Sequence, residues 1–166
     1  MSGQRKPVLA GGCQCGAVRY ALYAAPEQGG ICHCRMCQKA VGGPFKPWAR
    51  VRMENFAWTR GTPSVFRSSS VAERGFCSRC GTPLYFNYIK RTDAISVAAG
   101  SLDTPEAVTL SEVEGIESRL ANFDPALLAA LSSGASSQSG SSEDLSHIVS
   151  YQHPDCDTPA DWHPPS

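Results

Sequence analysis

Three features that would assign a protein to other classes are missing from this sequence. The first ten residues contain no apolar run of the kind that a secretory signal requires. No stretch is long and apolar enough to span a bilayer. Fifteen basic residues balance fifteen acidic ones, so no excess positive charge can attract nucleic acid or an anionic membrane. We therefore expect a reducing, cytoplasmic setting and a protein that binds neither nucleic acid nor membrane.

Cysteine is the abundant feature, with eight residues in a chain of 166. A secreted disulfide scaffold is one interpretation, but it needs an oxidising compartment, and cysteines two apart have poor geometry for ordinary bridges. Seven of the eight fall into three clusters, whose close spacing favours metal binding instead. The clusters are Cys13 and Cys15, then Cys32, Cys34 and Cys37, then Cys77 and Cys80.

Zinc in proteins is usually four-coordinate, so seven cysteines divide naturally into a closed set and an open set. The two outer pairs predict a closed structural zinc site, whose binding energy also stabilises the fold. These ligands are Cys13, Cys15, Cys77 and Cys80. The middle cluster, Cys32, Cys34 and Cys37, offers three thiolates and leaves a fourth position for water or substrate. Zinc held this way can act as a Lewis acid, and a thiol substrate suits its soft ligand set.

The middle cluster has a second interpretation, a structural zinc completed by a fourth ligand from elsewhere in the chain. His33 is the nearest candidate, but in an extended segment it points away from an ion shared by its cysteine neighbours. Three thiolates also leave the complex with net negative charge, which weakens its Lewis acidity. Cys156 is expected to be a free exposed thiol, and His147, His153 and His163 are weak ligand candidates in an irregular region.

Short alternating segments dominate the first hundred residues and predict a mainly β fold with little helix. Turns rich in glycine and proline separate these segments, as in residues 61–63 and 81–83. Helix signals come late and are weak. Ile116, Leu120 and Phe123 have helical spacing but are also compatible with a loop and one helical turn. The expected strands cover residues 18–23, 48–53, 64–68, 71–77, 84–88 and 94–98.

The composition changes after residue 131, where a serine-rich segment without large apolar residues begins. We expect one zinc-binding domain over residues 1–123 and a short helix, or a loop, over 124–131. Residues 132–166 would then be a flexible linker and an irregular tail. This tail either docks through Tyr151 and Trp162 or stays disordered.

Taken with their neighbours, the clusters resemble one known family, the glutathione-dependent formaldehyde-activating enzymes, also called the GFA or CENP-V group. The resemblance extends over about residues 11–123, and the combination of motifs is highly specific. The matching segments are residues 12–20, 32–38, 42–45, 66–69, 74–82 and 100–103, with Pro105.

This resemblance implies a fold of the β-tent kind with two zinc sites. It assigns Cys13, Cys15, Cys77 and Cys80 to the structural ion and Cys32, Cys34 and Cys37 to the catalytic ion. It also implies a carbon–sulfur lyase that makes or breaks S-hydroxymethylglutathione, with glutathione as co-substrate and a small thiol or carbonyl compound as partner. The loop over residues 40–45 would shape access to the working ion.

The sequence departs from the family pattern near its end. Ala121 and Asn122 stand where the family usually has proline and tryptophan, and the tail has no family counterpart. Two alternatives to the glutathione reaction therefore stay open. One is a lyase, isomerase or related enzyme that uses the same zinc scaffold on a larger biosynthetic metabolite without glutathione. The other is a non-catalytic zinc-binding interaction module.

Overall fold

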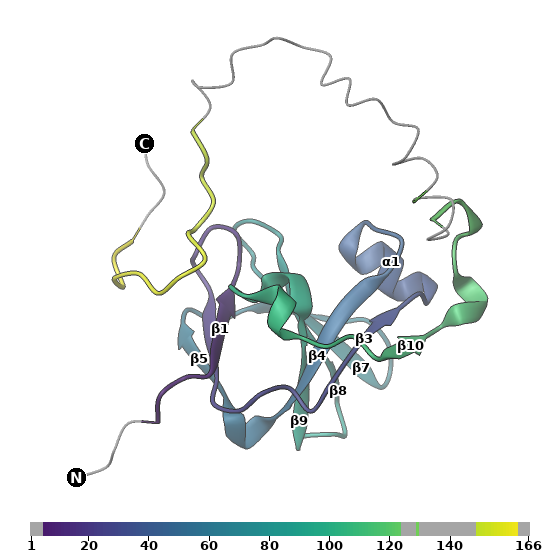
Figure 1. Ribbon diagram of the computed structural model, residues 1–166, viewed down its shortest axis with the longest axis horizontal. Helices are drawn as coiled ribbons and strands as arrows, with labels where there is room; N and C mark the ends of the chain where they lie inside the picture. Colours follow the sequence, from purple (N-terminus) through teal and green to yellow (C-terminus); the bar gives the residue numbers. More distant parts are fainter. Residues whose placement is uncertain (1–4, 124–128, 130–148, 163–166) are drawn as a thin grey trace.

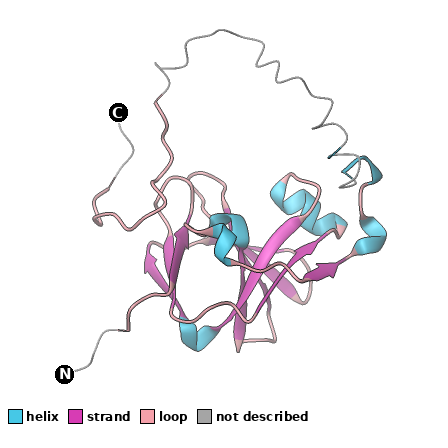
Figure 2. Cartoon of the chain, viewed as in Figure 1, coloured by secondary structure: helices cyan, strands magenta, loops and turns pink. Residues whose placement is uncertain are grey.

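The computed structural model describes residues 5–123, 129 and 149–162, and these residues form a mostly β structure (Figures 1 and 2). The mainly β prediction is therefore confirmed. The smaller sheet has the strand order β1 (Leu9–Gly12), β2 (Arg19–Leu22), β5 (Phe56–Arg60). The larger sheet has the order β10 (Glu112–Glu114), β3 (Gln28–Cys32), β4 (Lys46–Arg52), β9 (Ala94–Ala98), β8 (Pro83–Tyr88), β7 (Ala72–Phe76), β6 (Ser64–Arg67). Its β10–β3 pair is parallel, and the strand pairs from β3 to β6 are antiparallel.

Helical structure is limited to short elements. The α-helix α1 (Arg35–Val41) connects β3 to β4 and ends at Gly42, whose φ of +64° is in the left-handed region that favours glycine. The remaining helical elements are 3₁₀ turns at Met53–Asn55, Ala99–Ser101, Pro105–Ala107, Ile116–Ser118 and Ala121–Phe123. Within the described part of the chain, no helix is both long and apolar enough to cross a membrane.

The six strands expected from alternation all exist, as β2, β4, β6, β7, β8 and β9. The strands that alternation does not reveal are β1, β3, β5 and β10. Glycines interrupt the pattern in β1 and β3, and β10 is only three residues long. In β3 the lack of a side chain is required, because a Cβ on Gly30 would lie 2.7 Å from the Cβ of Glu112.

The hydrophobic core lies between the two sheets. Its largest members include Tyr20 and Phe56 from the smaller sheet and Leu84 and Tyr85 from the larger. The rings of Tyr20 and Phe56 stack with their centroids 5.5 Å apart. Buried cysteines Cys13 and Cys77 belong to the same cluster, so the predicted closed metal site lies at the edge of the core.

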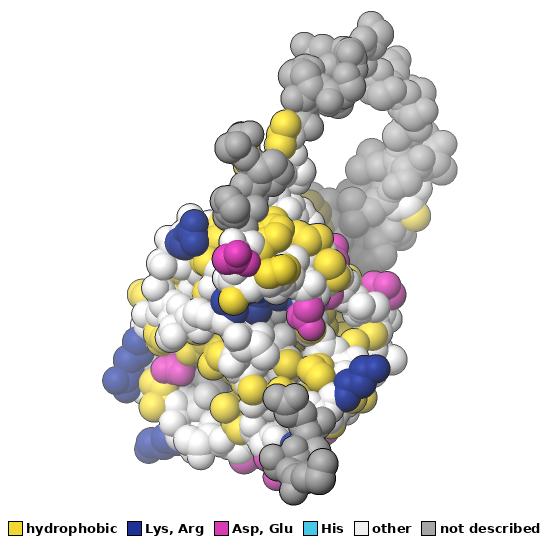
Figure 3. All heavy atoms as spheres, turned by 90° about the vertical axis from the view of Figure 1, so that its left-hand side faces the viewer, with side chains coloured by type: hydrophobic (Ala, Val, Ile, Leu, Met, Phe, Trp, Pro, Cys, Tyr) yellow, Lys and Arg dark blue, Asp and Glu magenta, His cyan; other side chains and the backbone are white. Residues whose placement is uncertain are grey.

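The late helical pattern gives two 3₁₀ turns and no longer helix over residues 116–123. Ile116 is exposed to 62% and Phe123 to 38%, while Leu120 is half-buried, so the three form no buried helical face. The segment 124–131, for which the sequence left a helix or a loop open, lies outside the described residues apart from 129. The serine-rich linker also lies outside them. On the face shown in Figure 3, basic and acidic side chains are scattered among hydrophobic ones.

Candidate metal centres and the cavity beside them

The cysteines of the predicted closed site lie in two tight turns that the fold brings together. Cys13 and Cys15 lie between β1 and β2, where the Gly16 N–H donates to the Cys13 carbonyl oxygen over 3.0 Å. The second pair lies between β7 and β8, where the Gly81 N–H donates to the Cys77 carbonyl oxygen over 2.8 Å. Both glycines have φ near the left-handed helical value, +71° and +77°. These turns aim the sulfurs of both pairs at one point.

The geometry of this cluster fits a tetrahedral metal ion. With zinc–sulfur bonds of about 2.3 Å, neighbouring sulfurs in a tetrahedral site lie about 3.8 Å apart. The Sγ atoms of Cys13 and Cys15 are 3.6 Å apart, and those of Cys15 and Cys77 are 3.8 Å apart. All four Sγ atoms lie within 4.8 Å of one another, and all eight cysteines of the chain are free. Although burial opposes it, hydrogen bonds from Thr82 lower the pKa of Cys80, which favours its metal-binding thiolate form.

The middle cluster also comes together, but with three cysteines. Cys32 ends β3, Cys34 caps the start of α1, and the Cys37 N–H donates to the Cys34 carbonyl oxygen over 2.9 Å. Their sulfurs lie within 4.8 Å of one another, and no fourth histidine, cysteine or carboxylate of the described residues joins them. His33 is buried against the ring of Phe45, with ring centroids 5.5 Å apart, and is not part of the cluster. The short helix α1, which the sequence did not predict, therefore supplies Cys37 and holds Cys34 at its N-terminus.

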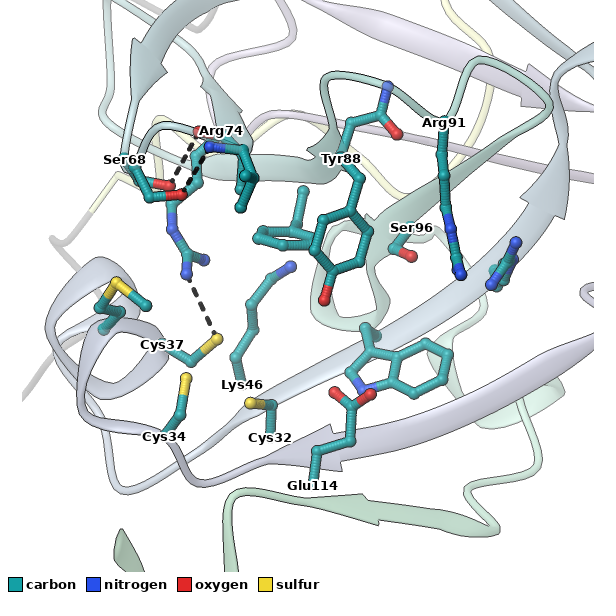
Figure 4. Close-up of a pocket in the computed structure, with 18 of the residues that line it drawn as sticks. Cys32, Cys34, Cys37, Lys46, Ser68, Arg74, Tyr88, Arg91, Ser96 and Glu114 are labelled. Carbon is teal, nitrogen blue, oxygen red and sulfur yellow. Dashed lines mark hydrogen bonds between the residues drawn. The ribbon is translucent and has the colours of Figure 1, made fainter.

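A cavity of about 480 Å³ adjoins the middle cluster, and all three cysteines line it, whereas the four cysteines of the other cluster do not (Figure 4). Its volume is in the range of small-molecule sites. The rings of Trp48, Phe86 and Tyr88 contribute apolar surface. The charged residues in its lining are Lys46, Arg50, Arg74, Arg91, Glu112 and Glu114.

Two buried cations lie next to the three cysteines. Lys46 is only 3% exposed, and its backbone lies opposite that of Cys32 in the register of β3 and β4. Arg74, on β7, directs its Nη2 at the Cys37 Sγ over 3.4 Å. The ring of Phe86 contacts both, with its centroid 5.6 Å from the Lys46 Nζ and 5.0 Å from the Arg74 Cζ. In Figure 4, Lys46 extends from β4 between the cysteines and Tyr88.

At this site, burial and neighbouring charges shift the pKa values of the ionisable side chains in opposite directions. Burial lowers the pKa of Lys46 to about 8, and the Arg74 charge adds to this shift, while negative charge on Cys37, Cys32 and Glu114 counteracts it. Burial also raises the pKa of Cys32. The pKa of Cys34 is lowered even though burial opposes it, because the Cys37 N–H and the neighbouring thiols hydrogen-bond its sulfur and the Arg74 charge attracts its thiolate.

One family model matches the part of the chain that holds both cysteine clusters. The family model described as glutathione-dependent formaldehyde-activating enzyme matches residues 8–114. The chain belongs to this family.

A curated relative of this GFA protein from Schizosaccharomyces pombe, named uncharacterized lyase C29B12.13, is 32% identical over 82 residues. The match covers 49% of this chain and 59% of the relative, so the chain spans somewhat more than half of that relative's length. Among solved structures, a Rhodobacter sphaeroides protein matches with a TM-score of 0.46 and 19% identity, over 72% of this chain and 94% of that one.

Sequence reasoning missed the cations of this GFA protein, although β4 carries a signal for them. Along β4, Lys46, Trp48 and Arg50 alternate with smaller residues, so all three point to one face of the sheet. Their side chains line the cavity, and the Trp48 Nε1 is buried without a hydrogen-bond partner among the described residues.

The loop over residues 40–45 was expected to shape access to the working ion, but it does not contribute to the lining of the 480 Å³ cavity. Ala40 and Val41 line a separate cavity of about 340 Å³ instead. Lys46 and Arg74 line both cavities. No residue of the loop is in the lining of the cavity that adjoins the three cysteines, and its expected role in access stays a prediction.

The tail, for which the sequence left docking or disorder open, is docked at His153 in its described part. His153 is only 3% exposed, and its backbone N–H donates to the Gln14 carbonyl oxygen over 2.7 Å. Its ring packs against Trp162, with centroids 4.5 Å apart. Arg60 donates to the Thr158 carbonyl oxygen over 2.7 Å. The tail thus docks on the turn between Cys13 and Cys15, through Trp162 as expected, whereas Tyr151 stays exposed. The two other tail histidines, His147 and His163, lie outside the described residues.

Proposed function

We propose that this GFA protein is a zinc-dependent carbon–sulfur lyase that makes or breaks a thiol–carbonyl adduct such as S-hydroxymethylglutathione. One observation carries the proposal. Two cysteine clusters have metal-binding geometry, and the cluster with only three cysteines lines a cavity large enough for a small molecule. The family and the relative that is named a lyase support the reaction class.

In the breakdown direction, the bond between sulfur and the hydroxymethyl carbon breaks, and the hydroxyl group loses its proton as the carbonyl forms. The electron pair of the broken bond stays on sulfur, which leaves as a thiolate. Cys32, Cys34 and Cys37 would hold a zinc ion, which would supply Lewis acidity to the oxygen or a binding position for the sulfur. Lys46 and Arg74 surround this end of the cavity with positive charge that favours the departing thiolate.

The charged residues of the cavity support a charged substrate of glutathione type, and the alternative is a larger biosynthetic metabolite. A metabolite enzyme on the same scaffold should have a deep apolar pocket, whereas six charged residues line this one. The other alternative, a non-catalytic module, would require a middle site whose metal ion is coordinated by protein atoms alone. No histidine, cysteine or carboxylate joins the three cysteines as a fourth donor within the described ranges.

The test compares the wild type with Cys34→Ser. Each protein is analysed for zinc content and for turnover of an adduct formed from glutathione and formaldehyde. We expect Cys34→Ser to lower turnover by at least about a hundredfold, because loss of a ligand should cost at least as much as loss of an outer-shell partner. Cys156→Ser is the matched control, since Cys156 is exposed and lies in neither cluster. Equal turnover in wild type and Cys34→Ser would refute the catalytic assignment.

A further inference from the structure

We infer that Lys46, together with Arg74, is a specificity-determining residue that makes the three-cysteine site accept its sulfur ligand as a thiolate. This inference rests on the proposed function and names the ionic form in which the site recognises its substrate. It assigns a task to two buried cations that belong to neither cysteine cluster.

Charge balance at the site is the first argument. The complex of three thiolates with a divalent cation has a net charge of about −1, and a fourth thiolate makes this net charge about −2. Lys46 and Arg74 are the two buried cations in the lining of the cavity, and they supply two positive charges. The buried charges of the site therefore balance when its fourth ligand is a thiolate, while Glu112 and Glu114 of the cavity lining are exposed to solvent. A neutral ligand such as water or an alcohol leaves one buried positive charge without balance, which is unfavourable in a desolvated site.

The positions of the two cations are the second argument. Arg74 already contacts the Cys37 Sγ, and the backbone of Lys46 pairs with that of Cys32, so both cations lie beside the cysteines. The ring of Phe86 contacts both side chains and restricts them to this end of the cavity. A cation held in place needs little reorganisation when an anion arrives, which is why preorganised charge discriminates well between ligands.

Lys46 also has no ion pair within the described part of the chain. Among the described residues, its Nζ forms no hydrogen bond and no ion pair, although it is almost fully buried. The other cations of the cavity differ in this respect. Arg50 forms an ion pair with Asp93 over 3.8 Å, and Arg74 directs its Nη2 at the Cys37 Sγ over 3.4 Å. An ammonium group that opens on a cavity beside a metal-binding cluster, on a residue that is otherwise buried, points to an anionic ligand at that position.

The test measures ligand binding without turnover. Wild type, Lys46→Met, Lys46→Arg and Lys39→Met are loaded with Co²⁺, and metal content is determined for each. Each protein is then titrated with 2-mercaptoethanol, a thiol without a carboxylate, and with 3-mercaptopropionate. The change in thiolate-to-cobalt charge-transfer absorption reports binding at the open position. Lys39→Met is the matched control, because Lys39 is an exposed lysine of α1 outside the cavity lining.

We expect Lys46→Met to weaken the binding of both thiols by about tenfold or more, since it removes one partner of a buried charge pair. Lys46→Arg should restore most of this affinity, and Lys39→Met should leave it unchanged. If Lys46→Met fails to fold or to hold Co²⁺, Arg74→Gln carries the same test with the same expected weakening.

The results separate this inference from the proposed function. Thiol binding that is unchanged in Lys46→Met, or in Arg74→Gln where that variant carries the test, overturns the inference and leaves the proposed function intact. Weakening confined to 3-mercaptopropionate also overturns it, because Lys46 would then recognise a carboxylate. A wild type that holds Co²⁺ at both clusters but binds neither thiol overturns the proposed function itself.

Discussion

The two cysteine clusters should differ sharply in what they contribute to stability, and Cys77→Ser compared with Cys37→Ser tests this. Cys77 belongs to the core cluster and is 1% exposed, and its sulfur lies beside that of Cys15, 62 positions away in the sequence. A metal ion there cross-links the turn after β1 to the turn after β7. The three cysteines of the middle cluster, in contrast, lie within six consecutive residues.

The expected magnitude follows from the lengths of the loops that the two metal ions close. A cross-link that closes a loop of about 60 residues restricts the unfolded chain by about 4 kcal/mol, whereas one that closes about six residues contributes about 2 kcal/mol. For a chain of this size, a loss of about 4 kcal/mol lowers the melting temperature by about 8 to 16 °C. Cys77→Ser should therefore lower it about twice as much as Cys37→Ser.

Thermal melts followed by circular dichroism, with zinc content measured on the same samples, provide the readout. Cys156→Ser serves as the control for loss of an exposed thiol. A chelator should lower the melting temperature of the wild type toward that of Cys77→Ser and have little further effect on that variant. Equal losses in Cys77→Ser and Cys37→Ser would refute the division into a structural and an open site.

Three further predictions concern the scaffold around the sites. Asp103→Ala should lower the free energy of unfolding by about 3 to 5 kcal/mol in urea titrations. The reason is that the buried Arg19, which donates to the Asp103 carboxylate over 2.7 Å, loses its main partner. A loss below about 1 kcal/mol contradicts this prediction. Gly75→Ala should cost about 1 to 3 kcal/mol in the same assay, because its Cβ would overlap the ring of Tyr85, and an unaltered midpoint argues against this close packing. Burial, assisted by the Arg19 charge, lowers the pKa of His153, so docking of the tail is fully stabilised above pH of about 6.5 and weakens as the pH falls toward that lowered pKa. Limited proteolysis of residues 149–162 should therefore accelerate between pH 7 and pH 5, and a rate independent of pH, after correction for the protease, contradicts the prediction.

Much of the fold could be predicted because short apolar and polar alternations mark most of its strands. β9 is found at the residues where its Ala-Ile-Ser-Val-Ala pattern predicts it, although it is buried on both faces. β3 was not predicted because Gly29 and Gly30 have no side chains that could show alternation. These glycines are needed because atoms from other segments approach them closely, which the local sequence does not reveal. The helix α1 was not predicted because it is short. The cysteines at its start were also interpreted as metal ligands in an extended segment.

Cysteine spacing alone determined the division of seven cysteines into a set of four and a set of three, because short spacings constrain local geometry wherever the segment lies. Only the tertiary structure decided what surrounds each set. Lys46 and Arg74 come from different strands, and their approach to Cys32 and Cys37 depends on the pairing of β3 with β4 and on the position of β7 in the same sheet. The docking of His153 on the first cysteine turn is likewise a contact between segments more than a hundred residues apart. A local pattern carries no information about such contacts, because burial and long-range packing create them.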